Sequence, residues 1–278
     1  TIELEGHGSF VAGLAGNSGA ANRGAGVREI SGLITAARHL GTDSRHALYE
    51  LTLRPWLHLA TLTSDCKVFQ DQTPVEVIRA VLADYAFAAE VRLIETYPVR
   101  DYCVQYNETD FEFITRLMQE WGINYHFEHS GGVHRLILSD HNGAFSPLQK
   151  DQPDSAYHRI AYYPPGHKVD EEYVSRLYVA DAIATGAWAS TDTDYTRSRA
   201  DLAAGARELR DTGHNSAEVF AWPVDSAQPQ AGSGGLSAQP NDAVAEGANF
   251  ARIRLQALQA PAHRATGHGN LRGVVTGC

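Results

Sequence analysis

The fold of this chain is decided by residues 97–140, which read YPVRDYCVQYNETDFEFITRLMQEWGINYHFEHSGGVHRLILSD. From Tyr102 to Tyr106 apolar and polar side chains alternate, which is typical of a β-strand with one buried face. The period then changes, and Thr109 with Glu112 three residues later forms a capping-box pattern, in which two free helix donors are satisfied reciprocally. A helix is therefore predicted to begin here.

This predicted helix, over about residues 110–121, has one apolar face. Phe113, Leu117 and Trp121 recur every four residues, and the side chains between them are mostly polar. Gly122 is predicted to end the helix, because glycine adopts the left-handed C-terminal conformation without steric cost.

A β-hairpin is predicted to follow the helix directly. Residues 123–128 and 135–139 are β-like, and Gly131-Gly132 lies between them as the turn. The whole stretch is therefore a strand, helix and hairpin unit. We expect the apolar face of the helix to be buried against the hairpin.

The order of residues in this unit resembles that of the VgrG family, the spike proteins of bacterial type VI secretion. The likeness is to the hub portion of those proteins, which is similar to the baseplate hub of contractile-tail phages. Two upstream segments, 49–57 and 68–73, resemble further motifs of the family. The signature positions are Arg100, Tyr102, Val104, Gln105, Tyr106, Glu108, Asp110, Phe111, Arg116, Leu117, Glu120, Gly122, Ile123, Tyr125 and Phe127.

The resemblance implies a mainly β fold with an α+β insertion, in which a pair of phage-hub-like, β-barrel-like modules carries short packed helices. Composition shifts place the first module at residues 1–66, the α+β region at 67–150 and the second module at 151–278. We expect the first module to lack its N-terminal strands, and the family's C-terminal OB-like needle region to be absent. Residues 223–243, rich in proline, glycine and serine, are predicted to form a mobile loop.

Other elements follow from local patterns. Thr73, Pro74 and Glu76 repeat the capping-box signal and predict a helix over about 74–88. Residues 200–210 fit either a short helix or a long edge strand. A final helix is expected over 243–259, with Phe250, Ile253, Leu255 and Leu258 on its apolar face. Strands are expected as short pieces within 1–40, as a longer stretch over 46–63, and over 173–181 and 218–222.

The resemblance also implies a mechanical function. The chain would be the hub of a type VI secretion spike, a homotrimer that caps the hexameric Hcp tube and carries the needle, a PAAR-type tip protein and effector cargo. Such a hub would assemble in the cytoplasm and then be secreted by the machine. A hub of a phage or of another contractile injection system is the alternative, and an enzymatic effector domain is a third, less favoured hypothesis.

Composition excludes some other classes. A net charge of −10 and a pI near 5.7 disfavour binding to nucleic acid, because like charges repel and no counterions would be released. No apolar run approaches the roughly 20 residues of a membrane-spanning helix. Three widely spaced cysteines do not form a disulfide framework, which is consistent with a reducing compartment.

Candidate chemical groups are few. His126, His129, His134 and His141 form the densest histidine group, but residues 126 and 129 of one strand point to opposite faces and do not share an ion. Cys103 lies on an alternating strand with no neighbouring base, so it is interpreted as a structural thiol. His263 and His268 are interpreted as solvated histidines beside turn glycines. We therefore predict no catalytic, cofactor-binding or metal site.

Overall fold

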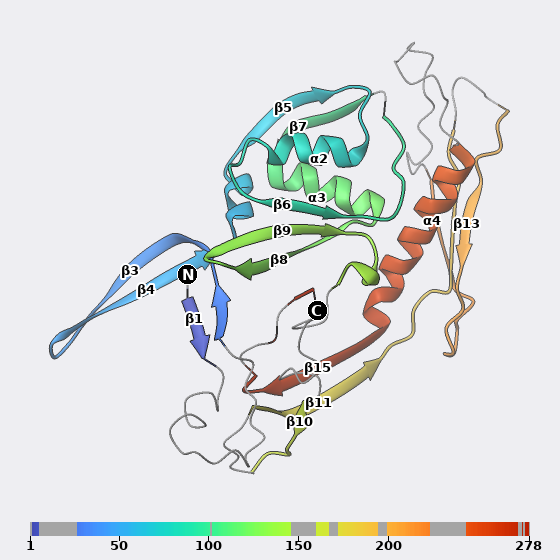
Figure 1. Ribbon diagram of the computed structural model, residues 1–278. Coiled ribbons are helices and arrows are strands. Elements are labelled where there is room, and N and C mark those ends of the chain that lie inside the picture. Colours follow the sequence, from blue (N-terminus) through green and yellow to red (C-terminus); the bar gives the residue numbers. More distant parts are fainter. Residues whose placement is uncertain are drawn as a thin grey trace.

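The computed structural model describes residues 2–5, 27–100, 102–145, 160–166, 172–193, 199–222, 243–271, 274 and 276–277. Its centre is a layered body in which two helices lie between two small sheets (Figure 1). A long hairpin projects from one side of this body, and a second group of strands with a long helix lies on the other side.

The N-terminal strands form two separate pairs. Strand β1 (Ile2–Glu5) is antiparallel to β2 (Val27–Ile30), and β3 (Leu33–Asp43) is antiparallel to β4 (His46–Arg54). The strand expected over 46–63 therefore ends early. Pro55 has no N–H to donate to a ladder, and the chain turns there into the 3-10 helix η1 (Trp56–Thr61).

The layered body contains the unit that the sequence predicted. Its elements, in chain order, are β5 (Ser64–Phe69), α2 (Pro74–Leu82), β6 (Ala89–Arg92), β7 (Cys103–Thr109), α3 (Asp110–Trp121), β8 (Asn124–Ser130) and β9 (Val133–Ser139). Strands β5 and β7 pair antiparallel above the helices, and β9 lies between β6 and β8 in the sheet below them (Figure 1). The strand, helix and hairpin predictions are confirmed.

Both helices begin as predicted. The Glu112 backbone N–H donates to Thr109 Oγ1 at 3.1 Å, and the Thr109 backbone N–H donates to Glu112 Oε2 at 2.9 Å, which completes the capping box of α3. Thr73 and Glu76 form the same box on α2. Helix α2 stops at Leu82, however, six residues before the predicted end, because the chain turns there and leads into β6.

The end of α3 brings two halves of the chain together. Gly122 has a φ of 69°, the left-handed conformation predicted for it. A Cβ atom at this position would lie 3.2 Å from Cγ1 of Ile253, so the absent side chain also makes room for a later helix.

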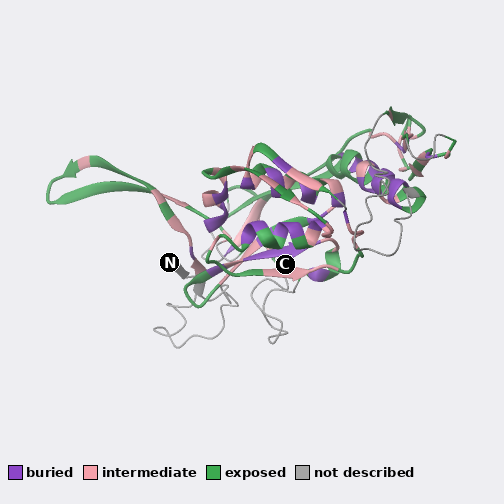
Figure 2. Cartoon of the chain, turned by 90° about the horizontal axis from the view of Figure 1, so that it is seen from above, coloured by how far each residue is buried: buried purple, intermediate pink, exposed green. Residues whose placement is uncertain are grey.

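The main core lies between the layers (Figure 2). The prediction that the apolar face of α3 is buried is confirmed, since Phe113, Leu117 and Trp121 share a buried cluster with Leu136 and Leu138 of the hairpin. Each fully buried large apolar side chain contributes roughly 1.5–3 kcal/mol. The other buried members are Trp56, Leu57, Ala60, Val77, Ile78, Val81, Leu82, Ile114, Met118 and Ile123.

The C-terminal half contains two further three-stranded sheets and one long helix. Their elements are η2 (Asn142–Ala144), β10 (Ala161–Tyr162), β11 (Tyr173–Asp181), β12 (Ala187–Ser190), β13 (Ala204–Arg207), β14 (Glu218–Ala221), α4 (Ala243–Gln259), η3 (Ala260–Ala262) and β15 (His263–Gly269). Helix α4 packs on β12 and β13 and also contacts α3. Strand β11 lies between β10 and β15, and β12 lies between β13 and β14.

Several predictions for this half are confirmed and two are corrected. The bounds of β11 and α4 agree with the prediction, and the ambiguous 200–210 segment contains a strand. Leu258 is exposed and not on the buried face of α4. His263 and His268 lie on β15 and not beside turns, because the glycines near them sit within a paired strand.

The mainly β fold with inserted helices is confirmed. Among the described residues the strands form separate sheets of two or three, and no sheet closes on itself as a barrel. Of the predicted mobile loop, residues 223–242 lie outside the described residues, and residue 243 begins α4.

Candidate functional site

The signature positions gather where β7, α3 and the segment before β7 meet. Strand β7 has one buried face, as predicted, but the side chains on that face are Cys103 and Gln105. Tyr102 and Tyr106 are 56% and 72% exposed. The tyrosines of the signature thus face outward, and its glutamine faces the core.

A buried polar network explains why a glutamine faces the core. Gln105 Nε2 donates to Asp110 Oδ1 at 2.7 Å, and the Tyr85 hydroxyl donates to Asp110 Oδ2 at 2.6 Å. The Asp110 backbone N–H also donates to the carbonyl of Thr63 at 2.9 Å. Buried polar groups require such partners. The network therefore fixes the start of α3 against β7 and the end of α2.

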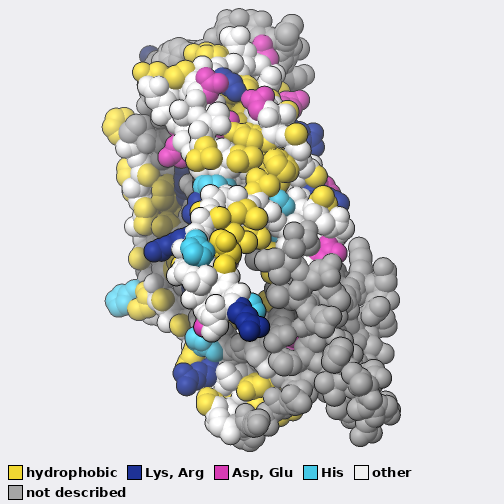
Figure 3. Space-filling view, turned by 90° about the vertical axis from the view of Figure 1, so that its left-hand side faces the viewer, with side chains coloured by type: hydrophobic (Ala, Val, Ile, Leu, Met, Phe, Trp, Pro, Cys, Tyr) yellow, Lys and Arg dark blue, Asp and Glu magenta, His cyan; other side chains and the backbone are white. Residues whose placement is uncertain are grey.

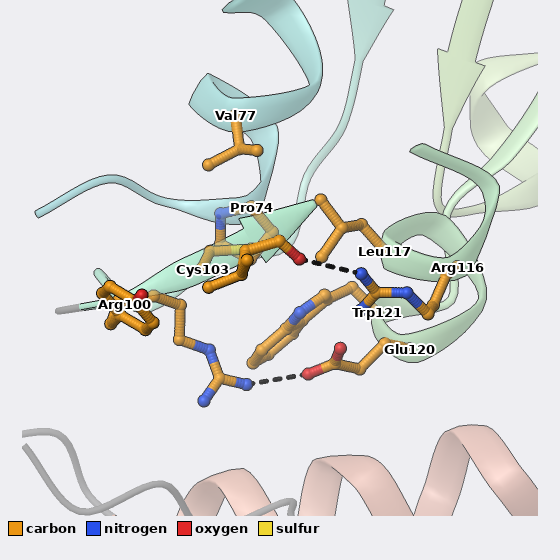
Figure 4. A pocket seen from close by; sticks show the side chains of 10 residues that line it. Pro74, Val77, Arg100, Cys103, Arg116, Leu117, Glu120 and Trp121 are labelled. Atoms are coloured by element: carbon orange, nitrogen blue, oxygen red, sulfur yellow. Dashed lines mark hydrogen bonds and ion pairs between the residues drawn. The ribbon is translucent and has the colours of Figure 1, made fainter. Parts of the chain in front are cut away.

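A second signature pair joins the segment before β7 to the end of α3. Arg100 Nη2 donates to Glu120 Oε1 at 2.9 Å, and the guanidinium lies 4.9 Å from the centre of the Trp121 ring (Figure 4). Arg100 is almost fully buried, and its Nη1 lies 3.9 Å from Glu246 Oε2 of α4. Its backbone exchanges two hydrogen bonds with Gln72. One arginine thus contacts three separate parts of the chain.

A third pair lies on the outer side of α3. Arg116 donates to both carboxylate oxygens of Glu108, at 2.6 and 3.2 Å, and to the carbonyl of Val104 at 3.2 Å. The hydrogen bond to Glu108 raises the pKa of Arg116. Its guanidinium also lies 5.3 Å from the centre of the Phe113 ring. This forked arrangement is the geometry in which arginine binds carboxylate well.

The remaining signature residues fill or flank the core. Leu117 and Ile123 are buried, Gly122 forms the C-cap, and Phe111 and Phe127 are partly buried against the same cluster. Tyr125 is exposed, and its ring lies nearly at right angles to the Phe127 ring at the edge of this cluster.

A hollow of about 230 Å³ lies between these groups and the start of α2. Its wall includes both arginines, Glu120 and the Cys103 side chain (Figure 4). Burial raises the pKa of the Cys103 thiol, which keeps it protonated and a poor nucleophile at neutral pH. Both arginines are engaged by carboxylates of the same chain. The hollow therefore offers no activated group for covalent chemistry.

The rings of His129 and His134, two of the four histidines considered for metal binding, stack 5.9 Å apart, but the ring nitrogens of these two histidines bond to different backbone groups. The Trp56 backbone N–H donates to His134 Nε2 at 2.7 Å, and that of Ser31 donates to His129 Nδ1 at 3.0 Å. His126 packs against Phe145, and burial lowers its pKa. Within the described ranges, no three metal-binding side chains form a group that could hold an ion. His141 bonds through Nδ1 to Asp140 at 2.8 Å.

Asp140 is an important residue that the sequence reasoning missed. Its carboxylate accepts hydrogen bonds from the backbone N–H groups of Ile94 and Glu95 and from the Tyr97 hydroxyl. Burial acts to raise the pKa of Asp140, but these donors and the His141 ring outweigh it, and the pKa is lowered. The only sequence signal is an aspartate directly after a strand, which is too common to identify the contact.

Residues 12–278 match the family model of the phage tail baseplate hub. The chain belongs to the phage tail baseplate hub family. One relative, the type VI secretion system spike protein VgrG1b of Pseudomonas aeruginosa, is 32% identical over 252 residues, which cover 90% of this chain and 31% of that protein. Another, the actin cross-linking toxin VgrG1 of Vibrio cholerae, is 28% identical over 249 residues, which cover 88% of this chain and 20% of that protein.

A solved structure shares the fold of this hub chain. The crystal structure of the tail protein from Neisseria meningitidis MC58 aligns with a TM-score of 0.52 and 12% identity, and the alignment covers 85% of this chain and 62% of that one. The predicted resemblance to the VgrG family is confirmed by the relatives. The hub chain spans less than a third of the length of the P. aeruginosa spike protein. In the part of the chain that the structure describes, no helix has the length and apolar character needed to cross a membrane.

Proposed function

We propose that this chain is the structural hub of a type VI secretion spike. In this proposal three copies form a ring that caps the hexameric Hcp tube and carries the needle, a PAAR-type tip protein and effector cargo. The ring assembles in the cytoplasm and leaves the cell with the fired machine. The observation that carries the proposal is the 32% identity to a spike protein over 90% of this chain.

The geometry of the signature residues supports a mechanical role. Arg100, Asp110 and Arg116 each bind partners of the same chain and thereby tie β7, α2, α3 and α4 to one another. We propose that the signature residues serve this structural purpose and do not bind a substrate. A rigid body of this kind would transmit thrust from the tube to the needle without deforming.

We also propose that the chain is not an enzyme. The toxin named among its relatives matches this chain over only 20% of its own length, so its activity can reside in the other 80%. In the described residues the carboxylates beside the hollow are engaged by arginines, and its thiol is held protonated.

We propose that the chain is divided into the three parts expected from its sequence, which are a first module at 1–66, an α+β region at 67–150 and a second module at 151–278.

A hub of a phage or of another contractile injection system is the second candidate. It is favoured by the family model itself, whose description is a phage tail baseplate hub. The two candidates share the ring and the tube contact and differ in the tube protein that the ring recognises.

A domain exchange separates these functions. Residues 12–278 of this chain replace the matching segment of the P. aeruginosa spike protein VgrG1b in a strain that lacks its own spike genes. Release of Hcp into the medium is then measured by immunoblotting, with the intact spike gene and an empty vector as controls. Restored release is the expected result. A chimera that is folded and abundant in the cell but releases no Hcp would refute the type VI assignment.

A further inference from the structure

The hairpin formed by β3 and β4 has an apolar face that its own chain leaves uncovered. The two strands contact each other far more than any other element, and the hairpin extends away from the body (Figures 1 and 2). A two-stranded ribbon is at best marginally stable in water by itself. This hairpin therefore requires another surface to cover it.

The register of the hairpin identifies the apolar face. Ala37 pairs with Leu51 and His39 pairs with Tyr49, so these four side chains lie on one face, and the rings of the last pair are 5.1 Å apart. Tyr49 is 65% exposed and Leu51 is 50% exposed. We call these four side chains, together with Ile34 at the base of the hairpin, the hairpin strip. It contains no Lys, Arg, Asp or Glu.

A second uncovered apolar face lies on the other half of the chain. Leu177 pairs with Gly267 and Val179 pairs with Ala265, which places these four residues on one face of the β11–β15 pair. Leu177 and Val179 are 57% and 59% exposed. We call these four residues the ribbon strip. None of the four residues of the ribbon strip is charged.

The two strips lie on different parts of the same molecule, and this decides what can cover them. A ring of three identical chains has heterologous contacts, in which one surface of each copy meets a different surface of the next. Such a ring therefore needs two complementary patches on each chain. Hydrophobic side chains gather near the middle of the face from which the hairpin projects (Figure 3).

Charge also favours a second copy as the occupant. Residues 33–54 hold three arginines (Arg38, Arg45 and Arg54) against two acidic residues (Asp43 and Glu50), a net charge of +1. The whole chain carries −10, so the rest of each copy carries −11. A hairpin that reaches toward the body of a neighbouring copy is thus attracted to it, whereas two copies of the body repel each other.

The area of contact is consistent with a closed ring and not with an isolated pair. Strand β4 has nine residues, which makes the hairpin about 30 Å long and roughly 10 Å wide. A footprint of about 300 Å² is well below the ~800 Å² that each partner of a typical stable complex buries. In a closed ring every copy makes two such contacts, and the second forms at a high effective concentration.

We propose that, in the trimer of the proposed function, the hairpin strip of one copy packs face to face on the ribbon strip of the next copy. The proposal rests on that trimer and specifies its contact surfaces. The two sheets would pack about 10 Å apart, the usual separation of stacked sheets.

The test uses the complete 278-residue chain in sedimentation velocity at a series of concentrations. Leu51→Glu places a charge in the hairpin strip, and Val179→Glu does so in the ribbon strip. Their matched controls are Leu48→Glu and Tyr178→Glu, which add the same charge on the opposite faces of the same strands, three residues and one residue away. Because all four positions are exposed, circular dichroism should show that every variant folds.

We expect Leu51→Glu and Val179→Glu to raise the concentration at which the trimer forms at least tenfold, and both controls to change it less than threefold. Combining Leu51→Glu with Val179→Lys should restore most of the loss, because opposite charges would then meet. A wild-type trimer that both strip variants leave intact overturns this inference and leaves the proposed function standing. A wild-type chain that is monomeric at every concentration overturns the trimer itself, and this inference with it.

Discussion

The buried carboxylate of Asp110 provides a direct test of how the signature side chains stabilise the fold. In an Asp110→Ala variant one N–H of the Gln105 amide and the hydroxyl of Tyr85 lose the carboxylate that accepts their hydrogen bonds, and the amide keeps only its bond to the Glu108 carbonyl. A buried donor left without a partner costs about 1–3 kcal/mol. Gln105 is fully buried, whereas Tyr85 is only partly buried and can bond to water instead. We therefore expect the free energy of unfolding to fall by about 2–4 kcal/mol.

The assay is urea unfolding followed by tryptophan fluorescence, analysed only where the slope with denaturant is unchanged. Glu112→Ala is the matched control, because it lies in the same helical turn but removes only the exposed half of the capping box and leaves no buried donor without a partner. A Gln105→Ala variant and the double variant with Asp110→Ala complete a cycle. We expect the two losses to add to more than the loss of the double variant by at least ~1 kcal/mol.

Two results would refute this reasoning. One is an Asp110→Ala variant no less stable than Glu112→Ala, which would mean that the buried contacts contribute no more than an exposed cap. The other is strict additivity in the cycle, which would mean that Gln105 and Asp110 stabilise the chain independently and that their 2.7 Å contact has no energetic role.

Three further predictions concern other parts of the chain. Burial lowers the pKa of His134, so its contribution to stability is complete above the unfolded value of 6.5 and decreases as the pH falls below it; unfolding at pH 7.5, 6.5 and 5.5 should show this loss, and a variant with His134→Gln should show less of it. Gly122→Ala should destabilise the chain by at least ~1 kcal/mol more than Gly131→Ala in urea unfolding, because both positions have positive φ but only Gly122 is crowded by α4; equal losses would contradict the packing of α4 on α3. With an aromatic disulfide reagent, the exposed thiol of Cys66 should react at least tenfold faster than the partly buried thiol of Cys103, measured in variants that lack Cys278 and retain one of the other two cysteines; equal rates would contradict the partial burial of Cys103.

Local signals predicted the central unit well. The caps at Thr73 and Thr109 and the glycine at 122 act through neighbouring residues, so the sequence alone contains the information that places them. The hairpin after α3 is equally local, because two glycines between two β-like runs determine its turn. The bounds of α3 and α4 therefore agree with the predicted ones.

Long-range contacts were not predictable in this way. The exposure of Tyr102 and Tyr106 depends on which face of β7 meets the helices, and the alternation is the same for either choice. The contact between Arg100 and Glu246 joins residues far apart in sequence, and no local pattern relates them. The six-residue 3-10 helix after Pro55 was not predicted, because its apolar residues also fit a strand.

The seam between α3 and α4 has a consequence for exchanging parts between hub proteins. Helix α4 sits where it does because position 122 lacks a side chain and because Arg100 lies near a carboxylate of α4. These features belong to segments more than a hundred residues apart, yet together they hold α4 against α3. Recombinants that take the first segment from one homologue and the last from another would lose this packing of α4 on α3, even with every individual element correctly folded. Crossover points should therefore keep both segments from the same parent.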